Sequence, residues 1–318
     1  MKTPKYWETH NLISFLLTPA GWLYGAATAM RLKFKKSFSA PVPVICVGNL
    51  TAGGVGKTPV SMALAEILIK LGKKPFFISR GYGGKLSGVI VNPSKHSAKE
   101  VGDEPLILAS VAPTVVCHDR AKAAEIAVDH GADVLIMDDG FQNPSLKKDV
   151  SLLVFSGQIG ILNGKILPAG PLRERFSAGI KRADAAIFIG EDQTGLLSCL
   201  DMPVLKVLIK EEIPANKNTD VVAFAGIGYP AKFYASLEKC GLHVVNAYDF
   251  PDHHFYKKDE LKAIIKKAEK KGVPAYTTQK DFVKIPPSMQ NNFQVLKIKA
   301  EFENKTNLIK LLKAKKVI

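Results

Sequence analysis

The feature that most constrains this chain is a glycine-rich loop. It follows a short apolar run, Val42 to Val47, and it precedes a helical pattern that opens at Pro59. Glycines let backbone N–H groups crowd around an anion, and the start of a helix adds free N–H groups and the positive end of its dipole. The loop therefore predicts a phosphate-binding site for a nucleotide. Its residues are Thr51, Ala52, Gly53, Gly54, Val55, Gly56, Lys57 and Thr58.

Two side chains of this loop carry the expected chemistry. We expect Lys57 to reach the β- and γ-phosphates of ATP and the Thr58 hydroxyl to bind Mg²⁺. The full pattern has a glycine five residues before Gly56, where this chain has Thr51. An ordinary glycine-rich turn is the alternative, and it leaves the lysine and the threonine unexplained.

Short apolar runs alternate with helical patterns over the rest of the chain. This alternation predicts an α/β fold with a mostly parallel sheet that is covered by helices on both faces. Ligands bind at the carboxyl ends of the strands in such sheets. The further strands are expected at 75–79, 114–117, 133–138, 150–155, 185–189, 204–209, from 221, and at 243–247, 273–278 and 293–298.

A length of 318 residues leaves room for two α/β domains. The chain turns polar between Glu211 and Asp220, and we place a boundary there. The expected units are an apolar and basic N-terminal segment, a nucleotide-binding domain and a smaller C-terminal α/β domain. Their bounds are 1–38, 39–215 and 216–318.

The N-terminal segment has the composition of a membrane-associating helix. No charged residue occurs between Asn11 and Met30, and basic residues follow at once between Arg31 and Lys36. About twenty residues are just enough to span a bilayer, but the segment contains Pro19 and several glycines. We expect a helix in the interface of an anionic leaflet, with the rest of the chain in the cytoplasm. The alternative is a core helix that packs on the nucleotide-binding domain.

The net charge is +15, and the lysines are spread along the chain. A basic balance suits nucleic acid, an anionic membrane or a polyanionic small molecule. We interpret most lysines as a solvated surface and expect no nucleic acid and no obligatory protein partner. The four cysteines are far apart and predict no metal site. Cys46, Cys117 and Cys199 lie in or beside apolar runs, so we expect buried free thiols.

Several polar residues follow predicted strands and are candidates for the site. Asp138 and Asp139 end an apolar strand, where a carboxylate would bind Mg²⁺ directly or through water. Asp103 is either a functional acid or the N-cap of a helix. His253 and His254 would point to opposite faces of an extended segment, so only one would face the cleft. A surface turn or a metal pair is the alternative for the two histidines.

Four other residues are assigned to substrate. Arg80 and Arg120 are expected to bind a phosphate of the substrate or the nucleotide, and surface ion pairing is the alternative. Glu174 is expected to orient substrate or Mg²⁺, and Gln142 is expected to contact substrate as well.

These motifs, in this order along nearly the whole chain, resemble the tetraacyldisaccharide 4′-kinase family of Gram-negative bacteria. The resemblance implies transfer of the γ-phosphate of ATP to the 4′-hydroxyl of a tetraacylated glucosamine disaccharide 1-phosphate, with Mg²⁺, at the cytoplasmic face of the inner membrane. It also implies two α/β/α domains, the smaller closing over the nucleotide. The shared motifs are Val47 to Asn49 with Gly53 to Pro59, Arg80 to Gly84, Val101 to Pro105, Asp138 to Gln142, Leu167 to Glu174, Asp252 to His254 and Thr277 to Asp281.

The resemblance also implies residue roles. The nucleotide and Mg²⁺ would lie on residues 51–58, with Asp138 and Asp139 near the metal. An aspartate–histidine pair that activates the sugar hydroxyl would consist of Asp103 and one of the two histidines. We favour His253 because it directly follows an aspartate, as in the family's pattern.

The chain departs from the family at two positions. Asn143 replaces a histidine, and Gln279 replaces a glutamate. Two rival functions stay open on the sequence alone. A nucleotidase that works as a dimer switch often has a lysine before the double glycine, where this chain has Ala52. A membrane or nucleic-acid binder without catalysis leaves the phosphate loop and Asp138 unexplained.

Overall fold

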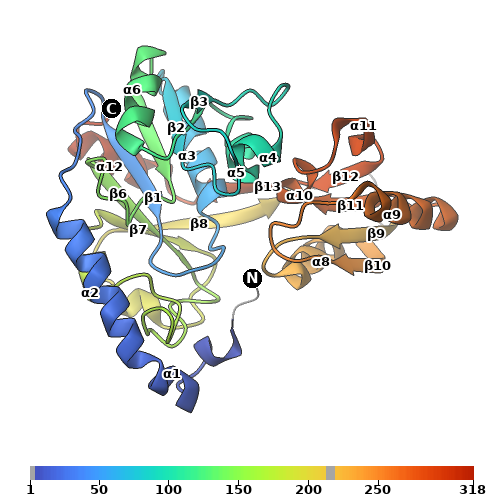
Figure 1. Cartoon of the computed structure of the whole chain (residues 1–318), viewed down its shortest axis with the longest axis horizontal. Helices are drawn as coiled ribbons and strands as arrows, with labels where there is room; N and C mark the ends of the chain where they lie inside the picture. The colour runs from blue at the N-terminus through green and yellow to red at the C-terminus, as the bar shows by residue number, and fades with distance from the viewer. Residues whose placement is uncertain (1–3, 213–218) are drawn as a thin grey trace.

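Two sheets lie side by side in this protein (Figure 1), and the structure, a computed structural model, describes residues 4–212 and 219–318. The larger sheet has nine strands in the order β13-β8-β7-β6-β1-β5-β2-β4-β3. All neighbours are parallel except at its edges, where β13 and β3 run antiparallel. The expected parallel-rich α/β fold is confirmed. The bounds are β1 (Val44–Gly48), β2 (Pro75–Ser79), β3 (Val89–Ile90), β4 (Thr114–Val116), β5 (Val134–Asp138), β6 (Val150–Ser156), β7 (Ala185–Ile189), β8 (Val204–Glu211) and β13 (Ile298–Phe302).

Helices cover both faces of the large sheet. Alternate residues of β1 enter two separate apolar clusters, because successive side chains of a strand point to opposite faces. One cluster includes the buried faces of α3 and α12, and the other includes α6. The central strands are therefore buried on both sides and mostly apolar, with Asp138, Ser151 and Ser156 as polar exceptions. The helices of this part are α3 (Lys57–Lys70), α4 (Ala98–Val101), α5 (Asp103–Leu108), α6 (Arg120–Asp129), α7 (Phe176–Ile180), η2 (Leu196–Cys199) and α12 (Lys305–Ala314).

The smaller sheet has four parallel strands in the order β10-β9-β11-β12. Helix α8 packs on one face through Phe233 and Leu237, and α9 packs on the other through Leu261 and Ile264. This unit is again a sheet between helices. The bounds are β9 (Thr219–Ala225), β10 (Leu242–Asp249), β11 (Ala275–Thr278), β12 (Phe293–Leu296), α8 (Pro230–Lys239), α9 (Lys258–Lys271), α10 (Gln279–Phe282) and α11 (Pro287–Gln290).

The end of the chain differs from the expected division. The single strand expected at 293–298 is two strands in different sheets, β12 in the small one and β13 in the large one. Ala300 and Phe302 of β13 and Leu308 of α12 are buried in the large sheet's core. Residues 298–318 therefore pack with the unit built on the large sheet, which we call the large unit, although 216–318 was expected to form the C-terminal domain. The position of the expected boundary, 215/216, lies outside the described residues.

The N-terminal segment forms a short turn, η1 (Lys5–Trp7), and two helices, α1 (Leu12–Leu16) and α2 (Thr18–Phe34). One face of α2 packs on the large unit. A Cβ on Gly21 would lie 2.9 Å from the carbonyl oxygen of Ile166, and Thr28 is buried. The other face exposes large apolar side chains, among them Trp22 and Leu23. No helix in the described part of the chain has both the length and the apolar character needed to cross a bilayer.

The cysteines are all free thiols. Cys46 and Cys117 are buried as expected, but Cys199 is exposed. Cys199 ends the short helix η2, whose buried residue is Leu196, so the apolar run at this point covers the core with other side chains.

Candidate functional site

The phosphate loop lies between β1 and α3, as the sequence predicts. Gly53 and Gly56 have φ values of 117° and 92°, in the region that favours glycine. A Cβ on Gly53 or Gly54 would meet no atom within 4 Å, so the loop faces open space. The base of the loop is fixed, because the Ala52 N–H donates to the carbonyl oxygen of Pro171 at 2.7 Å. A fixed, open loop at the start of a 14-residue helix suits an anion.

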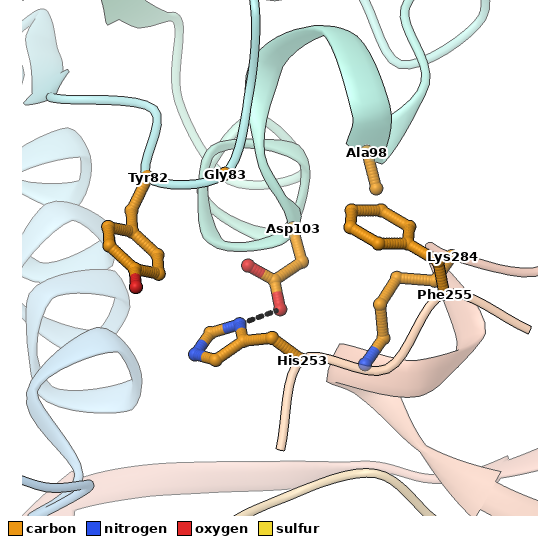
Figure 2. A pocket seen from close by; sticks show the side chains of 7 residues that line it. All are labelled: Tyr82, Gly83, Ala98, Asp103, His253, Phe255 and Lys284. Carbon is orange, nitrogen blue, oxygen red and sulfur yellow. Dashed lines mark hydrogen bonds and ion pairs between the residues drawn. The ribbon is translucent and has the colours of Figure 1, made fainter. Parts of the chain in front are cut away.

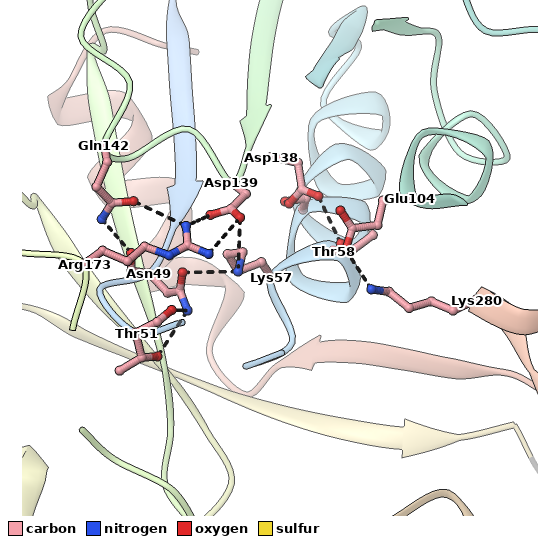
Figure 3. Close-up of polar contacts among 11 residues, drawn as sticks. Asn49, Thr51, Lys57, Thr58, Glu104, Asp138, Asp139, Gln142, Arg173 and Lys280 are labelled. Carbon is pink, nitrogen blue, oxygen red and sulfur yellow. Dashed lines mark hydrogen bonds and ion pairs between the residues drawn. The ribbon is translucent and has the colours of Figure 1, made fainter. Parts of the chain in front are cut away.

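Thr58 and Asp138 meet at the carboxyl ends of neighbouring strands (Figure 3). Strands β1 and β5 pair directly, which brings Asp138 to the start of α3. The Thr58 hydroxyl donates to Oδ2 of Asp138 at 3.0 Å, and Ser61 donates to Oδ1 at 2.8 Å. Burial and the nearby charge of Glu104 raise the pKa of Asp138 above its ordinary value.

These residues fit Mg²⁺. In the described ranges, 4–212 and 219–318, no three His, Cys, Asp or Glu side chains form a group that could hold a metal alone. Mg²⁺ bound with a nucleotide typically takes one or two protein ligands, phosphate oxygens and water. A hydroxyl and a carboxylate beside an open phosphate loop supply that set.

Asp139 joins the phosphate loop to an arginine that the sequence analysis did not assign. Lys57 Nζ lies 3.6 Å from Oδ2 of Asp139 and 3.2 Å from Oδ1 of Asn49. Both nitrogens of the Arg173 fork reach Asp139, at 2.8 Å and 3.3 Å. Burial opposes ionisation of Asp139, but Lys57 and Arg173 outweigh it and lower its pKa. Arg173 lies within the motif 167–174, which was its only signal in the sequence.

Gln142 and Glu174, both assigned to substrate, bond to each other. Gln142 donates to Oε1 of Glu174 at 3.0 Å and to the carbonyl oxygen of Asn49 at 2.9 Å. Glu174 is buried and forms an ion pair with Arg182. In this arrangement the two side chains hold the segments beside the phosphate loop together.

The two arginines assigned to phosphate occupy different environments. Arg120 is the first residue of α6 and is buried, with Nη1 donating to the carbonyl oxygen of Cys117 at 2.7 Å. Its Nε has no hydrogen-bond partner among the described residues. Arg80 is exposed after β2. Burial and the charge of Arg80 lower the pKa of Arg120 to about 10. The alternative of a surface ion pair is therefore wrong for Arg120, because its side chain is buried.

Asp103 and His253 meet across the two units (Figure 2). Nδ1 of His253 lies 3.0 Å from Oδ2 of Asp103, and Tyr82 packs edge-on against the imidazole. Asp103 is the first residue of α5, whose N-cap is Gly102. Asp103 is thus not the N-cap, although Oδ1 accepts from the Glu104 N–H at 3.0 Å.

The charges of this pair depend on each other. The hydrogen bond to Asp103 raises the pKa of His253, and burial opposes this shift only in part. Burial of Asp103 opposes its ionisation, but the His253 hydrogen bond and the charge of Lys280 outweigh burial and lower its pKa. The pair is a carboxylate that orients an imidazole, an arrangement suited to accepting a proton.

His254 faces away from Asp103. Its Nε2 lies 2.9 Å from Oε2 of Glu260, and its ring stacks on Phe250 at 4.9 Å between centroids. The structure therefore brings His253 rather than His254 to Asp103. His253 has a φ of 58° and lies in a turn, so the expected extended segment is wrong at this residue, although the two histidines do have different partners.

The motif 277–281 holds residues to which the sequence analysis gave no role. Lys280 Nζ lies 2.7 Å from Oε1 of Glu104, across the two units. Asp281 is fully buried and accepts from Tyr256 at 2.8 Å and from Thr278 at 2.7 Å. The two residues that depart from the family pattern each accept a hydrogen bond from a backbone N–H. Asn143 accepts from Ser145, and Gln279 accepts from Ile298.

A phosphate loop whose threonine hydroxyl bonds to an aspartate at the end of a neighbouring strand is typical of the phosphate-loop kinases. Residues 13–316 match the family described as Tetraacyldisaccharide-1-P 4'-kinase, LpxK. The chain belongs to this family and is an ATP-dependent kinase of lipid A biosynthesis.

Relatives and a solved structure agree with this assignment. Tetraacyldisaccharide 4'-kinase of Rhodospirillum centenum is 44% identical, over 98% of this chain and 96% of that protein. The enzyme of Gluconacetobacter diazotrophicus is 46% identical, over 91% and 90%. The crystal structure of LpxK from Aquifex aeolicus in complex with ATP is 30% identical and superposes with a TM-score of 0.77, over 96% of this chain and 99% of that chain.

Proposed function

We propose that this chain transfers the γ-phosphate of ATP to the 4′-hydroxyl of a tetraacylated glucosamine disaccharide 1-phosphate. Family membership supports the substrate class. The observation that supports the mechanism is the hydrogen bond between Asp103 and His253, which suits the imidazole to accept a proton. The phosphate loop supplies the donor side of the reaction, and this pair supplies the acceptor side.

On the donor side, the 51–58 loop binds the phosphates through its N–H groups, and Lys57 adds a positive charge. When bound, Mg²⁺ neutralises charge on the β- and γ-phosphates. Thr58 and Asp138 would hold it, with Asp139 nearby. Because phosphoryl transfer needs mainly positioning and neutralisation of charge, most of the rate enhancement comes from this side.

On the acceptor side, Asp103 holds Nδ1–H of His253 and leaves the lone pair on Nε2. His253 Nε2 takes the hydroxyl proton as the sugar oxygen forms its bond to the γ-phosphorus. The bond from that phosphorus to the β–γ bridging oxygen breaks, and ADP leaves. General-base help of this kind contributes about 10²–10⁴-fold. His254, bonded to Glu260, takes no part in this step.

We further propose that the four-stranded unit closes over the nucleotide as a smaller α/β/α domain. His253 and Lys280 support this proposal, because both come from that unit and contact residues of α5 in the large unit. A hinge near residue 297 is expected, since the chain passes between the sheets from β12 to β13 there.

We also propose that α1 and α2 hold the enzyme on the cytoplasmic face of the inner membrane. Support comes from the many exposed apolar side chains along α1 and α2, together with the basic residues in the last turn of α2. The exposed residues are Leu12, Ile13, Phe15, Leu16, Trp22, Leu23, Tyr24, Met30 and Phe34. The double variant Trp22→Asp, Leu23→Asp should lose sedimentation with anionic vesicles, whereas Ile69→Asp, exposed at the end of α3, should keep it.

The reaction is tested with purified full-length chain, ATP, Mg²⁺ and the acylated disaccharide 1-phosphate in detergent micelles. Mass spectrometry should show a lipid product heavier by one phosphate, and product should depend on both ATP and lipid. ATP hydrolysis without lipid, together with dimerisation on nucleotide binding, would instead support the nucleotidase switch.

A further inference from the structure

Lys280 is a lysine of the small unit that reaches the large one. It lies in α10, which packs against α5, and its Nζ lies 2.7 Å from Oε1 of Glu104. Both side chains are about one-third exposed, at 33% and 31%. The ammonium group is therefore held at the solvent-accessible boundary between the two units.

This position lies between the two halves of the site. The charge of Lys280 contributes to lowering the pKa of Asp103. The partner of Lys280, Glu104, directly follows Asp103 in α5. Figure 3 shows Lys280 and Glu104 beside Thr58 and Asp138. The ion pair therefore lies where α5 of the large unit meets α10 of the small unit, one residue from Asp103.

The other cations near the site have acid or amide partners of their own. On the acceptor side Lys284 is buried, with its Nζ 2.8 Å from Oδ1 of Asp281. Lys57 contacts Asn49 and Asp139, and Arg173 binds Asp139 with both of its nitrogens. On the acceptor side Asp103 lies 3.0 Å from Nδ1 of His253, Asp252 lies 3.9 Å from Nε2, and Glu104 follows Asp103 in the chain. A transferring phosphoryl group spreads negative charge over its oxygens, so it needs a cation there as well.

A contribution to the stability of the fold is a weak explanation for the Lys280–Glu104 ion pair. Two partly exposed opposite charges in contact add little to the stability of a fold. Burial lowers the pKa of Lys280, but Glu104 and Asp103 outweigh it and keep the ammonium group charged. The Glu104 carboxylate thus occupies a position beside Lys280 that a phosphate oxygen can take.

We propose that Lys280 binds the γ-phosphoryl group of ATP, exchanging Glu104 for a phosphate oxygen as the small unit closes. The proposal rests on the kinase function above and adds a residue of the small unit to the phosphate site. It makes closure depend on the γ-phosphate, because ADP has no group at this position.

The experiment measures binding of ATP and of ADP, each with Mg²⁺ and without lipid, by calorimetry on the full-length chain. Lys280→Ala should weaken ATP binding by about tenfold, as expected for loss of a charged hydrogen bond, and leave ADP binding within about twofold. Lys280→Gln, which keeps a shorter polar side chain without the charge, should behave like Lys280→Ala. Lys266→Ala removes an exposed lysine of α9 in the same unit and should change neither affinity.

ADP affinity also reports whether each variant is folded at the phosphate loop. Equal affinities for ATP in Lys280→Ala and the unaltered chain, with ADP binding intact, would overturn the proposal. So would equal loss of ATP and ADP binding in both Lys280 variants, since this would make the pair a structural bridge. Failure of the lipid transfer assay with a selective loss of ATP binding would reject the proposed substrate and keep the role of Lys280.

Discussion

The donor half and the acceptor half of the site are assembled differently. In the donor half, Thr58 and Asp138 come from segments around β1 and β5, which are adjacent strands of one sheet. In the acceptor half, Asp103 and His253 are 150 positions apart, and they belong to units with separate sheets. Strand pairing fixes the first half, whereas the second depends on how the two units are placed. The donor half should therefore bind nucleotide even when the acceptor half is damaged.

The largest expected effect is on the donor half. Lys57→Ala should lower kcat/KM by about 10³-fold or more, because it removes a cation that stabilises charge in the transition state. ATP binding should weaken as well. Transfer of labelled phosphate from ATP to lipid and calorimetry check the two effects. A normal rate in a folded Lys57→Ala protein would contradict the whole account of the site.

The next effect separates the halves. Asp103→Asn should lower kcat by about 10²–10³-fold while ATP affinity stays within about twofold, because the variant leaves the phosphate loop intact. In the Asp103→Asn background, His253→Gln should lower kcat by a much smaller factor than it does in the unaltered chain, since the two side chains act as one unit. Strictly multiplicative losses would show that they act independently.

The acceptor half should also set the pH profile. The raised pKa of His253 means that kcat/KM should rise with pH through a value above about 6.5, as the imidazole loses its proton. Asp103→Asn should move this rise to lower pH, since it removes the hydrogen bond that raises the pKa. Proton NMR titration of His253 in both proteins measures the shift directly, and an unchanged pKa in Asp103→Asn would contradict the pairing.

The same pair predicts a pH dependence of stability. Folding raises the pKa of His253. Its contribution to the free energy of unfolding is therefore full below the pKa of the unfolded chain, near 6.5, and is lost as pH rises through the pKa of the folded protein. The pKa of Asp103 is lowered, so its contribution is present above the unfolded value near 3.9 and is lost as pH falls through the folded value. Urea unfolding of the unaltered chain and of Asp103→Asn, from below about pH 3.9 to above about pH 6.5, measures how each contribution to the free energy of unfolding changes with pH.

The smallest effect is predicted for His254. His254→Gln should change kcat/KM by less than about threefold, because the ring bonds to Glu260 and stacks on Phe250 away from Asp103. His253→Gln is the matched comparison at the neighbouring position. A loss in His254→Gln as large as that in His253→Gln would mean that the imidazole beside Asp103 is not the proton acceptor.

Most of the donor half could be predicted from the sequence. The loop from Thr51 to Thr58, its helix and the strand that ends at Asp138 are contiguous segments with clear residue patterns. Arg173 was missed even though its motif was noted, since an arginine after a proline-rich turn has no pattern that names its partner. Its contact with Asp139 joins residues 34 positions apart.

The last strand shows a different limit. Residues 293–298 were expected to form one strand, but the chain leaves one sheet after Leu296 and enters the other at Ile298. The period-2 pattern says which side chains are buried, as with Ala300 and Phe302, but not in which sheet.

The sequence by itself determined the α/β class, the phosphate loop and the family motifs, because short-range patterns of glycine, apolar and charged residues encode them. Only the tertiary structure decided that His253 rather than His254 meets Asp103, that Lys280 reaches Glu104 and that the end of the chain returns to the large sheet. Each of these contacts joins segments far apart in the chain, so it depends on the packing of whole units and leaves no periodic signal in the residues that make it.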